Sequence, residues 1–199
     1  MSPRRMGVVL SAARWTLLAS SAVCLAWYAA ASAQSALFQV QQRTTLDELI
    51  AAARATGNDE RPDPGAARVR GGLIGRLEIA RLGVSAAVVE GDDPASLNVA
   101  IGHLPDTPLP WEEGNSALAA HRDTFFRPLE RIRTGDEIRF VTPEGDLLYR
   151  VRSTLVVLPE DVWVLAPTGR STLTLVTCYP FRYVGSAPRR YIVRADRVN

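Results

Sequence analysis

Two contrasting patterns of apolar residues divide the chain. No residue from Trp15 to Gln42 carries a charge, and Trp15 to Ala33 is mostly apolar, which is close to the roughly 20 residues that a spanning helix needs. From Gly72 onward, short apolar stretches alternate with turn-forming residues, which is typical of β-strands. The pattern therefore predicts an N-terminal membrane-spanning helix followed by an all-β domain.

The second region predicts seven strands, at residues 73–79, 84–90, 116–120, 137–142, 147–158, 173–178 and 190–195. The sequence Pro143-Glu-Gly-Asp146 predicts a hairpin turn, and segments 94–100 and 126–133 predict short helices. Closely spaced strands over about 129 residues favour a closed barrel, because closure removes exposed sheet edges.

The charges around the apolar segment predict its orientation. Arg4, Arg5 and Arg14 precede the segment, and no basic residue follows it until Arg43. By the positive-inside rule, the N-terminus then lies in the cytoplasm and the rest of the chain lies outside. The working domain is therefore expected to be extracytoplasmic and tethered to the cell membrane by a single-pass anchor.

A cleaved signal peptide is the alternative interpretation of the same segment. Residues 17–27 would form its apolar region, and Ala31-Ser32-Ala33 fits a cleavage site with small residues. Both interpretations export the remainder of the chain. They differ only in whether the domain stays tethered.

The pattern predicts four regions along the chain. They are a basic cytoplasmic N-terminus at 1–14, a transmembrane signal-anchor at 15–33, a juxtamembrane helix and linker at 34–70, and a folded domain at 71–199. The juxtamembrane helix is expected to run to about Ala55. Thr56 to Arg70 reads as a linker because it is rich in Gly, Pro and acidic residues.

Charge and composition exclude some partners. All 23 basic residues are Arg, the net charge is +2, and the basic residues form no stripe, so a nucleic-acid partner is not expected. No Cys-X-X-Cys occurs, and the two histidines are His103 and His121, which argues against a structural zinc site. The acidic turn around Glu90 to Asp93 lacks the full ligand spacing of a calcium site. No metal or cofactor is expected.

The candidate chemistry centres on Cys178, which ends a predicted strand. It should be a free thiol, because Cys24 lies in the apolar N-terminal segment. A thiol reacts as thiolate and needs a basic or cationic neighbour near neutral pH. His121 ends another predicted strand and Arg190 begins a third. A barrel can bring such strand ends together, although a lone Cys in this position is more often a small buried apolar residue.

Three motifs then resemble those of sortases, especially the class D-like group. They are Thr-Leu-Val-Thr-Cys178-Tyr-Pro-Phe, His121-Arg-Asp-Thr-Phe-Phe, and Gly185-Ser-Ala-Pro-Arg-Arg190-Tyr-Ile-Val, and they occur in the order found in that family. The resemblance covers about Gly72 to Asn199. It implies a closed eight-stranded sortase-like β-barrel with short helices, so that 71–199 would be a sortase catalytic domain.

The resemblance also implies a reaction and its residues. Cys178 would be the nucleophile, His121 the general acid or base, and Arg190 the group that stabilises the oxyanion or holds the substrate. The enzyme would cleave a sorting signal similar to Leu-Pro-X-Thr-Gly at the C-terminus of a secreted protein. The resulting thioacyl intermediate would pass its acyl group to an amine on a cell-envelope precursor or on another protein.

Several neighbouring residues have expected roles. Tyr179, Pro180 and Phe181 are expected to shape the loop that borders the substrate site. Arg189 competes with Arg190, but alternation along a strand places only one of them toward the site, and the register with Tyr-Ile-Val favours Arg190. His103 is expected to order its Pro-rich loop.

Other residues near the motifs bear on local contacts and on substrate preference. Arg122 and Asp123 are expected to make local polar contacts. Ala120 and Trp111 stand where the family commonly has Gly and a small residue, which bears on substrate preference more than on the reaction.

Two other functions are compatible with the same residues. In a thiol peptidase, water would resolve the thioester in place of an amine. In an inactive membrane-tethered module, the domain would only bind peptide tails. The products of the reaction, and the effect of replacing Cys178, distinguish these functions.

Overall fold

The computed structural model describes residues 3–56, 72–143 and 145–198. The chain divides into two units, Met1–Leu37 and Phe38–Asn199. The helix α1 extends from Pro3 to Thr56, so the predicted spanning helix and juxtamembrane helix are one continuous element. The predicted linker, apart from Thr56, lies outside the described residues.

The N-terminal helix contains a candidate membrane span. Residues Ala13–Gln42 are apolar enough and long enough to cross a bilayer, and the apolar stretch within this range has no buried residues. A signal sequence near the N-terminus would have the same properties. The helix is therefore compatible with both interpretations of the apolar segment.

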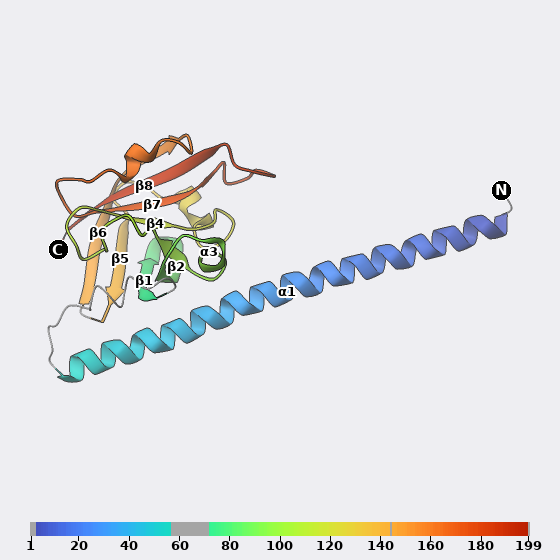
Figure 1. The fold of residues 1–199 in the computed structure, drawn as a ribbon, viewed down its shortest axis with the longest axis horizontal. Helices are drawn as coiled ribbons and strands as arrows, with labels where there is room; N and C mark the ends of the chain where they lie inside the picture. The colour runs from blue at the N-terminus through green and yellow to red at the C-terminus, as the bar shows by residue number, and fades with distance from the viewer. Residues whose placement is uncertain (1–2, 57–71, 144, 199) are drawn as a thin grey trace. The chain divides into compact units, whose positions relative to one another are not determined.

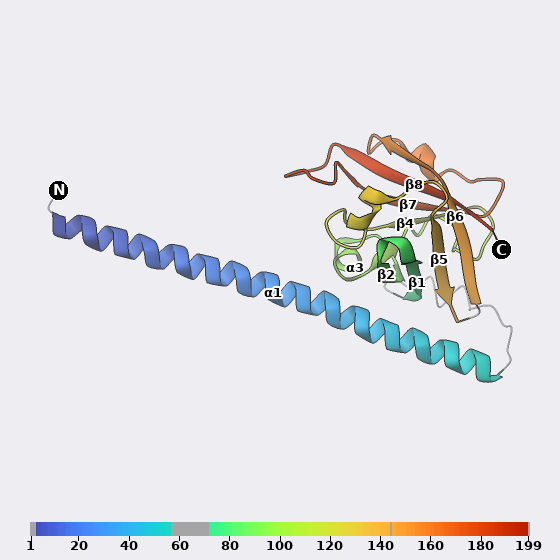
Figure 2. The same cartoon turned by 180° about the vertical axis from the view of Figure 1, so that it is seen from behind.

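The second unit contains a closed eight-stranded barrel (Figures 1 and 2). Its strands are β1 (Leu73–Ile79), β2 (Val84–Glu90), β3 (Ile101–His103), β4 (Asn115–Ala119), β5 (Glu137–Thr142), β6 (Gly145–Val157), β7 (Thr172–Tyr179) and β8 (Arg189–Arg197). Their order around the barrel is β1-β2-β3-β4-β7-β8-β6-β5. The β2–β3 and β4–β7 pairs are parallel, and the other pairs are antiparallel. The predicted fold is confirmed.

One strand was not predicted. β3 has three residues and lies between a short helix and the Pro-rich loop, so it is too short to have a periodic pattern of its own. Its pairing with β2 and β4 defines it as a strand. The predicted hairpin after β5 is confirmed by the pairing of Thr142 with Gly145.

Both predicted short helices are present, and they differ in type from each other. Segment 94–100 contains the α-helix α3 (Pro94–Val99), which Asp93 caps by accepting hydrogen bonds from the amides of Ala95 and Ser96. Segment 126–133 instead contains a 3-10 helix, η2 (Arg127–Arg131). Two further 3-10 helices, η1 (Ala80–Leu82) and η3 (Val162–Leu165), were not predicted.

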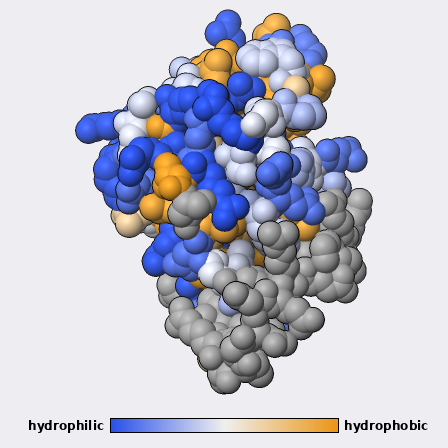
Figure 3. Space-filling model, turned by 90° about the vertical axis from the view of Figure 1, so that its left-hand side faces the viewer, coloured by the Kyte–Doolittle hydropathy of each residue, from blue (hydrophilic) through white to orange (hydrophobic). Residues whose placement is uncertain are grey.

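Apolar side chains from several strands fill the barrel. Leu77, Phe140, Leu118 and Leu175 are fully buried in one cluster, while the face in Figure 3 is mostly hydrophilic with small apolar groups. Gly75 is required where β1 pairs with β5, because an added Cβ would lie 2.6 Å from the carbonyl oxygen of Val141. The core thus depends on both apolar side chains and this close backbone approach.

A buried tyrosine anchors the Pro-rich loop to the core. The hydroxyl of Tyr149 donates a hydrogen bond to the carbonyl oxygen of Pro110. Burial raises the pKa of Tyr149 to about 12. The phenol is therefore neutral throughout the physiological pH range, and its hydrogen bond stays intact.

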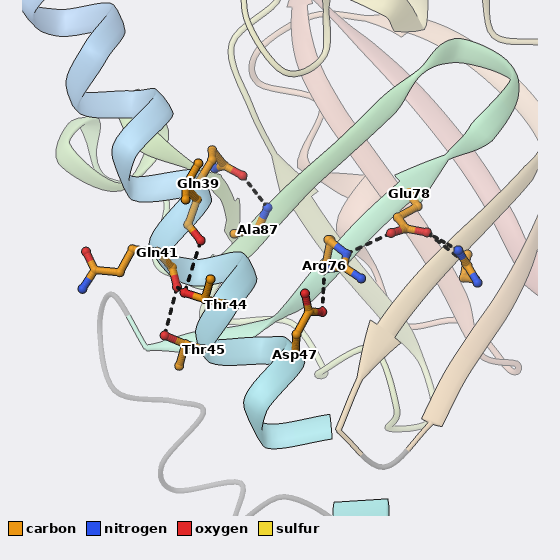
Figure 4. Close-up of polar contacts among 10 residues, drawn as sticks. Gln39, Gln41, Thr44, Thr45, Asp47, Arg76, Glu78 and Ala87 are labelled. Atoms are coloured by element: carbon orange, nitrogen blue, oxygen red, sulfur yellow. Dashed lines mark hydrogen bonds and ion pairs between the residues drawn. The ribbon is translucent and has the colours of Figure 1, made fainter. Parts of the chain in front are cut away.

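Within the second unit, the C-terminal part of α1 contacts the barrel (Figure 4). The side-chain amide of Gln39 accepts a hydrogen bond from the backbone amide of Ala87 at 2.9 Å and donates one to the carbonyl oxygen of Val99 at 2.6 Å. Asp47 forms an ion pair with Arg76 at 3.2 Å. The helix segment that begins at Phe38 is therefore held against β1 and β2 by polar contacts.

Candidate active site

Two parallel strands bring His121 and Cys178 to the same end of the barrel. In the register of β4 and β7, Ala119 is paired with Val176. The backbone amide of Ala120 also donates to the carbonyl oxygen of Val176 at 3.3 Å. His121 and Cys178 therefore each lie two residues beyond the same register pair. Both line one cavity of about 190 Å³.

Cys178 lies directly opposite Arg190 in the antiparallel pair of β7 and β8. Directly opposite residues project from the same face of a sheet. Arg189 is opposite Tyr179 and is exposed, whereas Arg190 is half-buried. Arg190, and not Arg189, therefore shares the face of Cys178.

The Arg190 side chain is held close to the backbone. Its Nη1 donates to the carbonyl oxygens of Arg189 at 3.2 Å and Ala187 at 3.4 Å. Ala187 also lines the cavity beside Cys178. Arg190 itself does not line this cavity, but its hydrogen bond to Ala187 connects it to the cavity wall, and its guanidinium keeps other donors for a ligand.

An apolar row lies next to the Cys178 row on the same face. Val157, Arg190 and Cys178 are opposite one another across β6, β8 and β7. The second row lies two residues further along each of these strands, about 7 Å away. Its members are Leu155, Ile192, Val176 and Ala119, the last of which is on β4. Ile192 is fully buried and the other three are half-buried, so an apolar surface adjoins the reactive row.

The β7–β8 loop (residues 180–188) forms one wall of the cavity. Gly185, Ser186 and Ala187 line it together with Arg122 and Asp123. Arg122 donates from Nη2 to the carbonyl oxygens of Tyr183 and Gly185, at 2.8 and 3.1 Å. The predicted local polar contacts of Arg122 are therefore contacts with this loop, 61 and 63 residues away in sequence.

Tyr179, Pro180 and Phe181 lie elsewhere. They line a second pocket of about 330 Å³ together with Glu130, Arg182 and Tyr191. The ring of Tyr179 stacks on Tyr191, with ring centres 6.0 Å apart. Because Tyr179 neighbours Cys178 on one strand, its side chain projects from the opposite face. The predicted substrate-binding residues do not line the Cys178 cavity.

His103 belongs to a buried polar network away from the cavity. Its Nδ1 is 2.9 Å from Oε2 of Glu90, and its Nε2 is 3.0 Å from the carbonyl oxygen of Pro108. Thr107 Oγ1 lies 3.2 Å from the same Nε2. These contacts order the Pro-rich loop, which is the role expected from the sequence.

Neither cysteine forms a disulfide. Cys178 is half-buried and free, and Cys24 is exposed and free. In the part of the chain that the structure describes, no three His, Cys, Asp or Glu side chains gather in a group that could hold a metal ion.

One known protein family matches most of the barrel domain. The family model described as "Sortase domain" matches residues 77–198, which is more than half of the chain. The chain belongs to the sortase family. Sortases are cysteine transpeptidases, and the resemblance found in the three sequence motifs is confirmed.

Individual sortases align over most of the barrel. Sortase D of Bacillus subtilis (strain 168) is 37% identical over 129 residues, covering 64% of this chain and 65% of that protein. Sortase A of Bacillus anthracis is 25% identical over 130 residues, covering 63% of this chain and 60% of that protein. The alignments thus span slightly less than two thirds of the length of these curated relatives.

Solved sortase structures have the same fold. A Clostridium perfringens sortase D5, described as a transpeptidase, superposes with a TM-score of 0.63 at 27% identity, covering 79% of this chain and 98% of that one. Sortase C-1 of Actinomyces oris gives a TM-score of 0.61 at 26% identity, covering 78% and 99%. The eight-stranded barrel of this sortase is therefore that of its family.

The sequence did not predict the second row or the role of Arg122. Alternation within β6, β7 and β8 contained the signal for the row, but the register between the strands was needed to align it. For Arg122 the sequence predicted local polar contacts but not their partners. Its partners lie in a loop whose position the sequence does not define.

Proposed function

We propose that this sortase is an extracytoplasmic transpeptidase that cleaves a C-terminal sorting signal similar to Leu-Pro-X-Thr-Gly and joins the new carboxyl end to an amine. The observation that carries the proposal is the direct pairing of Cys178 with Arg190, beside a cavity that His121 also lines. A nucleophile, an acid–base group and a fixed cation are the groups that acyl transfer through a thioester requires.

In the first half-reaction, the Cys178 thiolate attacks the carbonyl carbon of the scissile peptide bond. Negative charge develops on the carbonyl oxygen, and the Arg190 guanidinium donates hydrogen bonds to it. The carbon–nitrogen bond then breaks, and protonated His121 gives its proton to the departing amine. The products are a thioacyl enzyme, a free amine and a neutral imidazole.

In the second half-reaction, an incoming amine attacks the thioester carbonyl. Neutral His121 takes a proton from the amine nitrogen as the new carbon–nitrogen bond forms. The carbon–sulfur bond breaks and Cys178 leaves as thiolate. The thiolate and the protonated imidazole are then ready for the next cycle.

The apolar row supports the proposed substrate class. Val176 lies two residues before Cys178 on β7, roughly 7 Å away, and Ala119 and Leu155 continue the same apolar row onto β4 and β6. A peptide whose scissile carbonyl reaches Cys178 would place a residue two positions away at this distance. An apolar residue there, such as the Leu or Pro of the signal, would remove this surface from water.

Tyr179, Pro180 and Phe181 are proposed to contact the substrate through the second pocket. Since Tyr179 projects from the face opposite Cys178, this contact would involve a part of the substrate away from the scissile bond. The neighbouring ion pair of Arg182 with Glu130, at 3.5 Å, would give that pocket a polar side.

The proposed location follows from the N-terminal helix. An uncleaved span would leave the chain in the cell membrane as a single-pass protein with its barrel on the extracytoplasmic side. The partners are then secreted proteins that carry the sorting signal, and an amine acceptor on a cell-envelope precursor or on another protein.

The experiment uses the purified full chain with a panel of peptides of the Leu-Pro-X-Thr-Gly type and a small amine. Mass spectrometry is expected to detect a thioacyl adduct on Cys178 and a peptide–amine product. Cys178→Ala should abolish both. The matched control is Cys24→Ala, which removes the other thiol and should retain both.

Two outcomes would contradict the proposal. If wild-type protein gives only hydrolysed peptide at saturating amine, the chain acts as a thiol peptidase. If peptide binds but Cys178→Ala changes no product, the domain is a binding module and Cys178 is not a nucleophile.

A further inference from the structure

Arg122 contacts the β7–β8 loop at three points. Its Nη2 donates to the carbonyl oxygens of Tyr183 and Gly185, and its guanidinium carbon lies 5.8 Å from the centre of the Tyr183 ring. The other terminal nitrogen, Nη1, is buried and has no hydrogen-bond partner among the described residues. The hydrogen bonds to the loop therefore come from Nη2 alone.

The loop contacted by Arg122 is the wall of the Cys178 cavity. Gly185, Ser186 and Ala187 line the cavity, and Cys178 and His121 line it as well. The middle of the loop is otherwise exposed: Val184 is 99% exposed. An exposed loop of this kind has low local stability unless side chains from elsewhere hold it. Arg122 supplies such contacts at the carbonyls on both sides of Val184.

The contact between Arg122 and the β7–β8 loop is close in the chain to all three proposed reactive groups. Arg122 directly follows His121, and the loop connects Cys178 on β7 with Arg190 on β8. A shift of the loop away from Arg122 would therefore enlarge the space between His121 and the loop wall. Water would then enter beside the sulfur atom on which the acyl group is proposed to reside.

We propose that Arg122 is a positioning residue that holds the β7–β8 loop over the Cys178 cavity and so limits hydrolysis of the thioacyl intermediate. This inference rests on the proposed function. In hydrolysis a water oxygen attacks the thioester carbon, one water proton passes to His121, and the carbon–sulfur bond breaks to give a carboxylic acid and the thiolate. Transfer uses the same steps with an amine nitrogen. The two reactions compete for one intermediate, so exclusion of water favours the amine.

Arginine is suited to this role by its shape and charge. The guanidinium is planar, stays charged, and can stack on an aromatic ring while it donates to carbonyl groups. A lysine ammonium could reach one carbonyl, but it has no planar face to lie over Tyr183. Arg122→Lys should therefore keep part of the effect, and Arg122→Met should lose it.

The test measures the ratio of hydrolysed to transferred peptide at one fixed amine concentration, using full-length protein. Arg122→Met is expected to raise this ratio on the order of tenfold, as loss of charged hydrogen bonds to the loop implies, and Arg122→Lys by a smaller factor. The matched control is Arg150→Met, which removes an equal charge from β6, away from both pockets. Arg150 is 55% exposed and pairs with Glu137 at 3.1 Å, so the ratio of this variant should stay within about twofold of wild type.

The thioacylation rate separates this inference from the proposed function. If wild-type protein forms no thioacyl adduct, the proposed function fails first. If the adduct forms and Arg122→Met slows both product channels equally, Arg122 does not govern access of water and the inference is wrong. Arg122→Lys is the second variant in case Arg122→Met does not fold. It keeps the charge but loses the planar donor that reaches both carbonyl oxygens, and an unchanged product ratio in Arg122→Lys would also contradict the inference.

Discussion

The hydroxyl of Thr177 donates a hydrogen bond to the carbonyl oxygen of Ala120 at 2.8 Å, and both residues are buried. Thr177 immediately precedes Cys178 and Ala120 immediately precedes His121. The bond therefore joins β7 to the end of β4 one residue before each of the two proposed reactive groups. The bond fixes the separation of His121 and Cys178 at the point where the regular hydrogen-bond ladder between β4 and β7 ends.

Replacing Thr177 by Val should reduce catalysis more than substrate binding. The variant keeps the shape but loses the donor, so the spacing of Cys178 and His121 becomes less defined. We expect kcat to fall roughly ten- to hundredfold with little change in KM, and Thr177→Ser to recover most of the loss. Steady-state kinetics at several peptide concentrations measure both quantities.

Thr142 provides a matched control for Thr177. Its hydroxyl donates to the carbonyl oxygen of Gly145, also at 2.8 Å, in the β5–β6 hairpin. Thr142→Val and Thr177→Val should each lower the free energy of unfolding by about 1 kcal/mol. If both variants lose kcat equally, the Thr177 effect is one of stability and not of positioning.

The two adjacent arginines should differ in their effect on thioacylation. Arg190→Lys removes the planar fork on the Cys178 face, and we expect the rate of thioester formation to fall on the order of 10²-fold. Arg189→Lys is the matched substitution on the opposite face, and its rate should stay within about twofold of wild type. Single-turnover labelling of Cys178 measures both rates. A larger loss in Arg189→Lys would contradict the assignment from the register.

Gln39 should stabilise the contact between α1 and the barrel within the second unit. Gln39→Ala removes both amide hydrogen bonds, and the amide of Ala87 loses its acceptor (Figure 4). We expect faster hydrogen exchange at the Ala87 amide and a loss of about 1 to 2 kcal/mol in the free energy of that local opening.

Gln41 is the control on the same helix. Its side chain is exposed and points away from the strands in Figure 4. Gln41→Ala should leave exchange at Ala87 unchanged. Equal protection of Ala87 in wild type and Gln39→Ala would mean that the amide contact does not hold the helix in solution.

Asp136 should make stability depend on pH in the acid range. The hydrogen bond from Arg81 is the main cause that lowers the pKa of Asp136, and the backbone amide of Arg133 also donates to its carboxylate at 2.8 Å. Because the folded-state pKa is below the unfolded value of about 3.9, the ionised carboxylate stabilises the fold above that pH. This contribution is lost as the pH falls through the lowered pKa.

Asp136→Asn tests this linkage. At neutral pH we expect the variant to be less stable than wild type by about 1 to 3 kcal/mol. The difference should shrink as the pH falls below about 4. Urea unfolding at several pH values measures the free energy of unfolding for both proteins. A difference that stays constant down to pH 2 would show that ionisation of Asp136 is not the source.

Local sequence was sufficient to identify the family and most of the fold. The motifs around His121, Cys178 and Arg190 are short and contiguous, so they can be recognised without a structure. The strands with clear apolar alternation were likewise predicted, because each carries its own period. β3 was missed since three residues carry no period, and its neighbours β2 and β4 determine its conformation.

Contacts between distant segments decided the rest. Arg190 was favoured over Arg189 from the sequence, but only the pairing of Cys178 with Arg190 across two strands fixes which arginine shares the reactive face. The same register turns Tyr179 to the other face and into a second pocket.

The sequence by itself determined the apolar N-terminal segment, the barrel class and the candidate reactive residues, because these depend on composition and on neighbours along the chain. Tertiary structure decided which residues share the Cys178 cavity and that Arg122 holds the loop above it. Those relationships depend on strand register and on hydrogen bonds over about 60 residues of chain, and no local pattern encodes them.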